Sequence, residues 1–223
     1  MPSSDGAPIE AGAAFPDALL VPLLDRVDSL LKTRRRVLLG VVGEPGVGKS
    51  TLAEALLDGS RARGVPTERV AMDGFHLADR QLDRLNRRDR KGAIDTFDAH
   101  GYLALLRRVA TELDHTVYAP AFDRTREEPV AGAVAVPPGT RLVVTEGNYL
   151  LDDAAPWHEV RAALTETWFC ETDSALRRRR LIDRHVHFGK SPDAARHWVD
   201  TVDEINAARV VAHRDRADLI VRF

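Results

Sequence analysis

The chain has 223 residues, a formal net charge of −2 at pH 7, and 44% hydrophobic and 30% charged residues. A chain of this length can bury a core without disulfides or metals, and its ordinary composition argues against a disordered or a membrane protein. Because no basic excess is present, a nucleic-acid partner is not expected. The single cysteine, Cys170, cannot form an internal disulfide, which favours a reducing, cytoplasmic compartment.

The N-terminal segment differs from the rest of the chain. Residues 1–14 are small and polar and include Pro and Gly, so we expect a disordered leader followed by a single domain over 15–223. No apolar run approaches the roughly 18 residues that a membrane helix needs, so no membrane partner is expected.

Hydrophobic periodicity then predicts the elements in chain order. Over 15–32, apolar residues recur at intervals of three and four, which is typical of an amphipathic helix. Residues 37–42 (VLLGVV) form a continuous apolar run, which indicates a strand buried on both faces. The same reasoning predicts helices over 50–57, 98–113, 156–164, 174–187 and 192–213, and strands over 69–72, 142–145, 167–170 and 219–221.

Residue types mark two helix boundaries, whereas residues 115–140 fit more than one structure. Ser191 before Pro192 has the residue types of a helix N-cap and first turn, and Gly189 suits the end of the preceding helix. Residues 115–140 are rich in Pro, Gly and β-prone fragments, so either a hairpin or an irregular loop is open there. Elsewhere strands and helices alternate, which predicts an α/β fold with a parallel five-stranded sheet.

The motif that decides the class lies between the first strand and the next helix. Residues 43–50 read GEPGVGKS and fit the pattern G-x-x-x-x-G-K-[ST] of a phosphate-binding P-loop. In such a loop Lys49 reaches the β- and γ-phosphates and Ser50 ligates Mg²⁺. A glycine-rich turn with a surface lysine is the alternative, and the strand–loop–helix context disfavours it. We therefore predict ATP and Mg²⁺ as cofactors, with a nucleotide site formed by Gly43, Glu44, Pro45, Gly46, Val47, Gly48, Lys49, Ser50 and Thr51.

Other P-loop classes are less well supported. The string at 86–89 (NRRD) lacks the lysine of the guanine-reading Asn-Lys-x-Asp motif, and the LSGGQ-like signature of transporter ATPases is absent. A small-molecule kinase is the favoured function. A nucleotide-dependent switch or a binding protein without kinase chemistry is the alternative.

Three further segments carry a resemblance to a known group. These are MDGFH at 72–76, YAPAFDR at 118–124 and LVVTEGNYLL at 142–151. With the P-loop, they resemble the uridine kinase, phosphoribulokinase and bacterial pantothenate kinase group over about 37–223, and in particular uridine kinase-like and fructose-transport-associated kinases. The resemblance implies a three-layer P-loop NTPase fold with strand order 2-3-1-4-5 and a helical lid.

The resemblance also implies roles for single residues. Asp73 is the expected base for the acceptor hydroxyl, and Glu146 is expected near Mg²⁺ as a metal residue. Arg124 is expected to contact the acceptor, together with Glu146, Asp73 and Tyr149. For Asp73 the alternative is a strand-end carboxylate that caps backbone N–H groups.

Histidine and arginine candidates complete the site. For His76 a structural role and a substrate contact are equally open. In the run at 177–180, Arg177, Arg180 and Arg184 share one helix face, which suggests an arginine-bearing lid with Arg180 and Arg184 as catalytic residues. A solvated helix face is the alternative.

The acceptor and the assembly stay open at this point. A nucleoside, a pantothenate-like alcohol and a sugar each offer a hydroxyl that this apparatus can phosphorylate, so the expected partner is a small-molecule hydroxyl acceptor. A homodimer is also open, because dimers are the commonest assemblies of soluble proteins.

Overall fold

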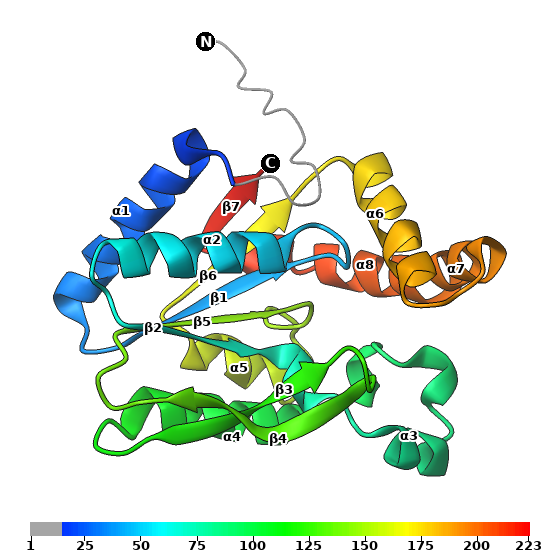
Figure 1. The fold of residues 1–223 in the computed structure, drawn as a ribbon, viewed down its shortest axis with the longest axis horizontal. Coiled ribbons are helices and arrows are strands. Elements are labelled where there is room, and N and C mark those ends of the chain that lie inside the picture. The colour runs from blue at the N-terminus through cyan, green and yellow to red at the C-terminus, as the bar shows by residue number, and fades with distance from the viewer. Residues whose placement is uncertain (1–14) are drawn as a thin grey trace.

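Five parallel strands form the main sheet, in the order β2-β5-β1-β6-β7 (Figure 1). The computed structural model describes residues 15–223, so the leader predicted over 1–14 lies outside the described residues. Counted along the chain among themselves, the sheet strands have the order 2-3-1-4-5, which confirms the predicted α/β fold. Their bounds are β1 Val37–Gly43, β2 Thr67–Ala71, β5 Leu142–Gly147, β6 Glu166–Glu171 and β7 Leu219–Arg222.

Helices cover both faces of this sheet. Four of them agree with the periodicity to within two residues at each end, whereas α2 extends five residues beyond its predicted end. The α-helices of residues 15–223 are α1 Asp17–Thr33, α2 Lys49–Ala62, α3 Asp79–Leu85, α4 Ala99–Thr111, α5 Trp157–Ala163, α6 Ser174–His187, α7 Pro192–Trp198 and α8 Glu204–Val211. The short helix α3 was not predicted, because its seven residues offer only Leu82 as a buried anchor.

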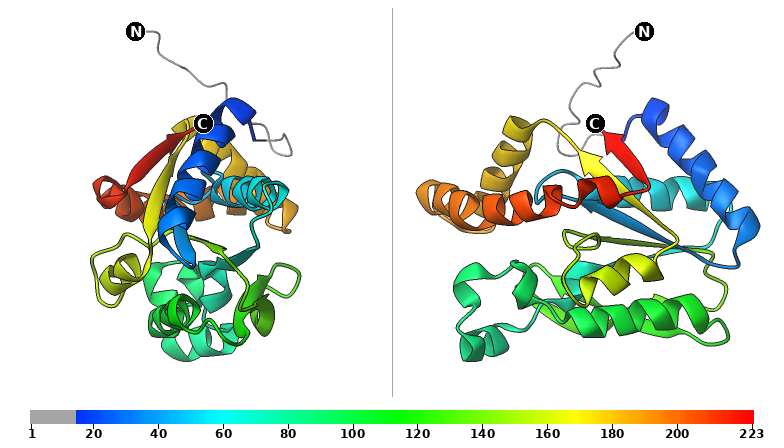
Figure 2. Two further views of the ribbon diagram at one scale, coloured as in Figure 1. Left: turned by 90° about the vertical axis from the view of Figure 1, so that its left-hand side faces the viewer. Right: turned by 180° about the vertical axis from the view of Figure 1, so that it is seen from behind.

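The central strand β1 supplies both hydrophobic cores. All seven of its residues are buried, and successive side chains of a strand point to opposite faces. Leu39 and Val41 join an apolar cluster with residues of α1 and α2, whereas Leu38 and Val42 join a cluster with residues of α4 and α5. The sheet is therefore the middle of three layers (Figures 1 and 2).

The segment between α4 and β5 is a hairpin. Strands β3 (Val117–Asp123) and β4 (Glu128–Val136) pair antiparallel, with a register shift between Ala119 and Ala121. Of the two structures left open for 115–140, the hairpin is thus the one observed. It packs against the short 3₁₀ turn η1 (Met72–Phe75) that follows β2, so it borders the carboxyl end of the sheet.

The prediction of a single helix over 192–213 is wrong in one respect. It is divided into α7 and α8 by a π-helical turn, η4 (Val199–Asp203). The start is as predicted, since Ser191 accepts a hydrogen bond from the N–H of Ala194 and Pro192 lies in the first turn. Gly189, with φ +96°, follows α6. Periodicity did not reveal the π turn, because each flank taken alone keeps the apolar spacing of an α-helix.

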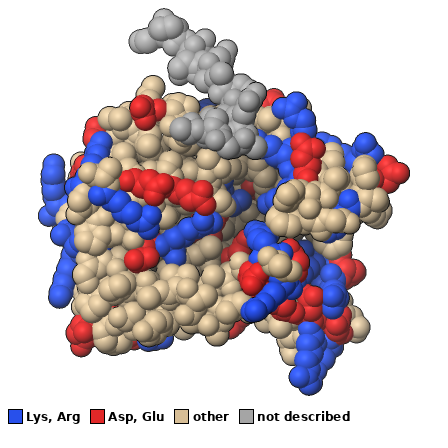
Figure 3. All heavy atoms as spheres, viewed as in Figure 1, with Lys and Arg blue, Asp and Glu red and all other residues tan. Residues whose placement is uncertain are grey.

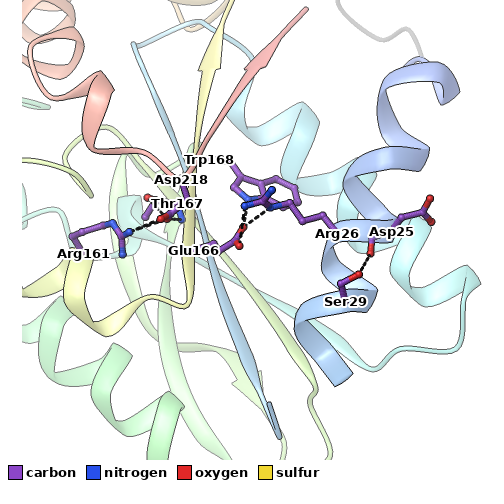
Figure 4. A network of polar contacts seen from close by, with 8 residues as sticks. All are labelled: Asp25, Arg26, Ser29, Arg161, Glu166, Thr167, Trp168 and Asp218. Atoms are coloured by element: carbon purple, nitrogen blue, oxygen red, sulfur yellow. Dashed lines mark hydrogen bonds and ion pairs between the residues drawn. The ribbon is translucent and has the colours of Figure 1, made fainter. Parts of the chain in front are cut away.

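The amino end of the sheet is held by carboxylates (Figure 4). Glu166, the first residue of β6, accepts two hydrogen bonds from Arg26 of α1 and one from the indole of Trp168. Asp218, just before β7, accepts from Arg161 and from the backbone and hydroxyl of Thr167. These contacts stabilise the end of the sheet opposite to the P-loop.

The helices α3, α6 and α7 project from the carboxyl end of the sheet, the end at which β1 leads into the P-loop (Figures 1 and 2). On the face drawn in Figure 3, basic and acidic side chains are interspersed, and neither sign forms a continuous patch. Within residues 15–223, none of the helices is long and apolar enough to cross a membrane.

Candidate active site

The P-loop connects β1 to the first turn of α2. Gly46 has φ +79° and Gly48 has φ +104°, values that L side chains rarely adopt. A Cβ on Gly46 would also lie 2.6 Å from Cγ of Leu181 in α6. The glycines therefore allow both the turn and the close approach of α6, and they leave the first N–H groups of α2 directed toward a phosphate position.

Lys49 lies folded along this loop. Its Nζ donates hydrogen bonds to the carbonyl oxygens of Gly43 and Glu44, each at 2.9 Å, and the residue is 9% exposed. Burial lowers the pKa of Lys49 below its ordinary value, against the opposing effect of Glu146. The loop thus holds a poorly hydrated cation at the position where phosphate charge has to be neutralised.

Ser50 and Glu146 form an oxygen-donor pair at the edge of the sheet. The hydroxyl of Ser50 donates to Oε1 and Oε2 of Glu146 at 2.9 and 3.1 Å. Arg69 of β2 also pairs with this carboxylate, and its guanidinium reaches Glu54 on the other side at 3.1 Å. A hydroxyl and a carboxylate are oxygen ligands of the kind that Mg²⁺ prefers, so the residues fit the expected metal.

Asp73 lies at the carboxyl end of β2, in the turn η1. Its Oδ2 accepts a hydrogen bond of 2.8 Å from Arg124 of the β3–β4 hairpin. Burial by itself would raise the pKa of Asp73, but the positive charges of His76, Arg124, Lys49 and Arg184 outweigh it and leave the pKa below the ordinary value of 3.8. The carboxylate is therefore ionised at neutral pH.

His76 is held among aromatic rings. Its ring centroid lies 4.1 Å from that of Phe97 and 4.8 Å from that of Phe122, and its Nδ1 is 2.8 Å from the carbonyl oxygen of Asp73. Burial lowers the pKa of His76, although the charge of Asp73 opposes the shift. The imidazole thus forms part of an aromatic wall beside the Asp73 carboxylate.

The arginines of α6 do not act as one group. Arg177 is buried, its Nε lies 3.2 Å from Glu44, and its NH2 donates to both oxygens of Glu204 at 2.8 Å. It therefore ties the P-loop to α8 and does not point at a phosphate, so its expected place on the phosphate face of the lid is wrong. Arg180 lies beside Gly48 of the P-loop, and burial lowers the pKa of both Arg180 and Arg184.

One cleft of about 670 Å³ collects most of the predicted residues. Those that line it are Pro45, Gly46, Gly48, Lys49, Ser50, Thr51, Asp73, His76, Arg124, Glu146, Arg180 and Arg184. Gly43, Glu44 and Val47 are not among the lining residues. Val47 is fully buried and the Glu44 side chain contacts Arg177, so a contact of these three with nucleotide would come from the main chain and stays a prediction.

The structure corrects the prediction for Tyr149. It was expected to bind the substrate directly, but it is 1% exposed and does not line the cleft. Its hydroxyl donates to the carbonyl oxygen of Gly92 at 2.7 Å, and its ring packs edge-on against Trp157 and Phe97. Burial raises its pKa well above the ordinary value. The side chain of Tyr149 points into the core, where it supports the loop at Gly92 through this hydrogen bond.

Comparison with known proteins places this cleft in a family. A candidate uridine kinase of Schizosaccharomyces pombe is 32% identical over 208 residues, which cover 90% of this chain and 88% of that protein. The chain belongs to the uridine kinase-like P-loop kinases. No family model matches it. A second relative of this uridine kinase-like chain, the uncharacterized protein YggC of Escherichia coli, is 33% identical over 206 residues, covering 91% and 85% of the two chains.

A solved structure agrees with this assignment. The crystal structure of a candidate fructose transport system kinase from Silicibacter sp. superposes with a TM-score of 0.83 at 38% identity, covering 90% of this chain and 98% of that one. As a uridine kinase-like P-loop kinase, the chain is an ATP-dependent phosphotransferase with an alcohol group as acceptor.

Several cleft residues of this uridine kinase-like chain were missed. Lys91 lines the cleft and pairs with Asp79 at 2.7 Å, while Asp203 and Asn206 line it from the other side. Arg69 was missed as the partner of Glu146. Arg69 lies in β2, which pairs with β5, the strand of Glu146, so only the strand order reveals this contact. The others had no motif, since they meet only when the loop after α3 and the η4–α8 segment lie at the same end of the sheet.

Proposed function

We propose that this cleft transfers the γ-phosphoryl group of MgATP to a hydroxyl group of a small metabolite. The observation that carries the proposal is that Lys49, the Ser50–Glu146 pair and the ionised Asp73 line one cleft. A switch or a simple binding protein needs the first two features, but it has no use for a carboxylate beside an acceptor-sized space.

The nucleotide side is formed by the start of α2. Backbone N–H groups there and the side chain of Lys49 are suited to hold the β- and γ-phosphates. Arg180 from α6 is placed beside Gly48 to neutralise charge on the transferred group. Ser50 and Glu146 would hold Mg²⁺, which when bound neutralises phosphate charge and orients the terminal phosphates.

The acceptor side is formed by Asp73 and its neighbours. The acceptor oxygen forms a bond to the γ-phosphorus as the bond between that phosphorus and the β,γ-bridging oxygen breaks, and ADP leaves. The hydroxyl proton passes to the Asp73 carboxylate, which is ionised and so able to accept it. Arg184, which also lines the cleft, is placed to stabilise the charge of the transferred group.

The test is turnover by a matched set of variants. The intact protein is incubated with MgATP and a pool that contains nucleosides, sugars and pantothenate-like alcohols, and products are identified by mass spectrometry. We expect a phosphorylated product from the wild type, none from Lys49→Ala, and a rate about 10²- to 10⁴-fold lower from Asp73→Asn with ATP affinity unchanged.

Asp153→Asn, a 73% exposed carboxylate that does not line the cleft, serves as the control and is expected to behave as wild type. Normal turnover by Asp73→Asn would show that Asp73 is not the base. ATP binding by the wild type without any product from the pool would favour the switch or binding function.

A further inference from the structure

Arg177 is buried at the point where three elements meet. Only 4% of its side chain is exposed, and its Nε lies 3.2 Å from Oε1 of Glu44 in the P-loop. Its Nη1 donates a long hydrogen bond of 3.4 Å to the carbonyl oxygen of Pro45. Its Nη2 donates to both carboxylate oxygens of Glu204, the first residue of α8, at 2.8 Å. One guanidinium therefore joins α6 to the P-loop and to α8.

The charges around Arg177 favour a fixed position of its guanidinium. Burial raises the pKa of Glu44, and the charge of Arg177 is the strongest effect that opposes this shift. Lys49 opposes it more weakly, whereas the charges of Glu204 and Glu171 add to it. Without Arg177, the Glu44 carboxylate would face the charge of Glu204 and lose its ion-pair partner. The electrostatics therefore hold the guanidinium between the P-loop and α8.

The base of α6 also packs directly against the backbone of the P-loop. A Cβ on Gly46 would lie 3.0 Å from the carbonyl oxygen of Arg177 and 2.6 Å from Cγ of Leu181. This contact limits how closely α6 can approach the loop, because a backbone oxygen cannot move aside alone. The ion pair with Glu44 limits how far α6 can withdraw. The two contacts together fix the distance between α6 and the P-loop.

Two cleft arginines follow Arg177 along the same helix. Arg180 comes three residues later and Arg184 seven residues later, about one and two turns on. Nη1 of Arg180 lies 3.8 Å from the position that a Cβ on Gly48 would take, and both arginines line the cleft. Because a helix moves as a rigid element, the base of α6 sets where the Arg180 guanidinium lies relative to the phosphates. A misplacement of about 1 Å can cost about 100-fold in rate.

We propose that Arg177 is a positioning residue, which holds α6 at a fixed distance from the P-loop so that the guanidinium of Arg180 meets the γ-phosphate of bound ATP. Arg177 does not line the cleft, so it acts without touching the nucleotide. Its effect on the reaction passes through Arg180. The inference rests on the proposed kinase function, because the γ-phosphoryl group is what Arg180 has to meet. An ion pair with only a structural role would change stability alone.

The first experiment measures nucleotide binding without turnover. Isothermal titration calorimetry is carried out on the full chain with Mg²⁺ and either ADP or the non-hydrolysable analogue β,γ-imido-ATP. For Arg177→Met and for Arg180→Met we expect the Kd of the analogue to rise about 10-fold or more and the Kd of ADP to change less than about threefold, because only the analogue carries a γ-phosphate. The double variant should bind the analogue no more weakly than Arg180→Met, because Arg177 acts through Arg180.

The second experiment measures turnover. ADP release is followed with MgATP and the pool of nucleosides, sugars and pantothenate-like alcohols, at a temperature at which circular dichroism shows every variant folded. We expect release about 10- to 100-fold slower for Arg177→Met, and no further loss when this change is added to Arg180→Met. Glu204→Gln keeps the side-chain shape but removes the charge, so a milder loss of about 2- to 5-fold is expected. Arg196→Met on α7, 57% exposed and outside the cleft, is the control and should behave as wild type.

The outcomes separate the two proposals. If Arg177→Met weakens ADP and the analogue equally, or if its effect multiplies with that of Arg180→Met in the double variant, Arg177 does not position Arg180. The same conclusion follows if Arg177→Met lowers only the melting temperature and leaves the Kd of the analogue unchanged. If the preference for the γ-phosphate is lost as expected but the wild type phosphorylates nothing in the pool, the positioning role stands and the proposed kinase function fails.

Discussion

The hydroxyl of Ser50 donates to both carboxylate oxygens of Glu146, and the two residues are 96 positions apart in the chain. Ser50 comes from the first turn of α2 and Glu146 from β5, the strand that pairs with β1. The carboxyl end of β5 therefore brings an acidic oxygen beside the P-loop hydroxyl. This contact brings together the two oxygen donors of the predicted metal site within the cleft.

Removal of either oxygen donor should weaken the use of Mg²⁺. For Ser50→Ala and Glu146→Gln we expect the Mg²⁺ concentration for half-maximal turnover to rise by about tenfold or more, because a lost ligand or orienting group typically costs 10- to 100-fold in metal affinity. Mn²⁺ binding, followed by EPR with an ATP analogue present, gives a readout without turnover. Ser29→Ala on the exposed side of α1 is the control. Unchanged metal dependence in both variants would place the metal elsewhere.

Arg69 should contribute to stability through Glu146. The Glu146 carboxylate is 8% exposed, and Arg69 is its cationic partner at the sheet edge. In Arg69→Met this buried carboxylate keeps only the Ser50 hydroxyl, so we expect a loss of about 1–3 kcal/mol in the free energy of unfolding, measured by urea denaturation. Arg61→Met removes a pair with the exposed Asp58 and a long hydrogen bond of 3.4 Å to the carbonyl oxygen of Thr67, and it should cost less than about 1 kcal/mol. Equal effects of the two variants would contradict this role.

The pH dependence of turnover should reveal the Arg124–Asp73 pair. Burial raises the pKa of Asp73, but nearby positive charges, including Arg124, bring it below 3.8, so the base stays ionised as the pH falls toward that value. Arg124→Ala removes one of these charges, and we expect the acid limb of kcat/KM to move to higher pH. Arg126→Ala, a 72% exposed neighbour in the same turn, is the control. Superimposable profiles of the two variants would mean that Arg124 does not tune the base.

Gly74 should tolerate no side chain. A Cβ at this position would lie 2.4 Å from the carbonyl oxygen of Pro120, which is backbone of β3 and cannot move aside alone. We expect Gly74→Ala to destabilise the protein by about 1–3 kcal/mol in thermal unfolding and to lower acceptor turnover more than ATP binding. Gly139→Ala has open space around its Cβ and should have little effect. Wild-type behaviour of Gly74→Ala would show that the hairpin can shift away from Asp73.

The local elements were largely predictable because their signals lie within a few residues. The apolar period of α6 predicted the helix 174–187 with the bounds observed, and the apolar run before the glycine loop predicted the buried strand β1. The π turn inside 192–213 was not predictable in this way. It depends on the packing of α7 and α8 against the rest of the protein, while each flank alone keeps the apolar spacing of an α-helix.

Side-chain direction was harder to predict than position. Tyr149 and Arg177 were placed near the site by a matching segment and by helix periodicity, yet both side chains point into the packed interior. Tyr149 finds the Gly92 carbonyl, and Arg177 finds Glu44 and Glu204. These partners lie in other elements, so no spacing within one element could reveal them.

The amino-acid sequence alone determined the class of this protein, because the P-loop GEPGVGKS and the segment around Asp73 act through short, local geometry that their residue types specify. Only the tertiary structure decided which further side chains line the cleft. Asp203 and Asn206 lie more than 100 residues from Asp73 in the chain, and they reach the same cleft because the strand order and the π turn bring α8 to the carboxyl end of the sheet.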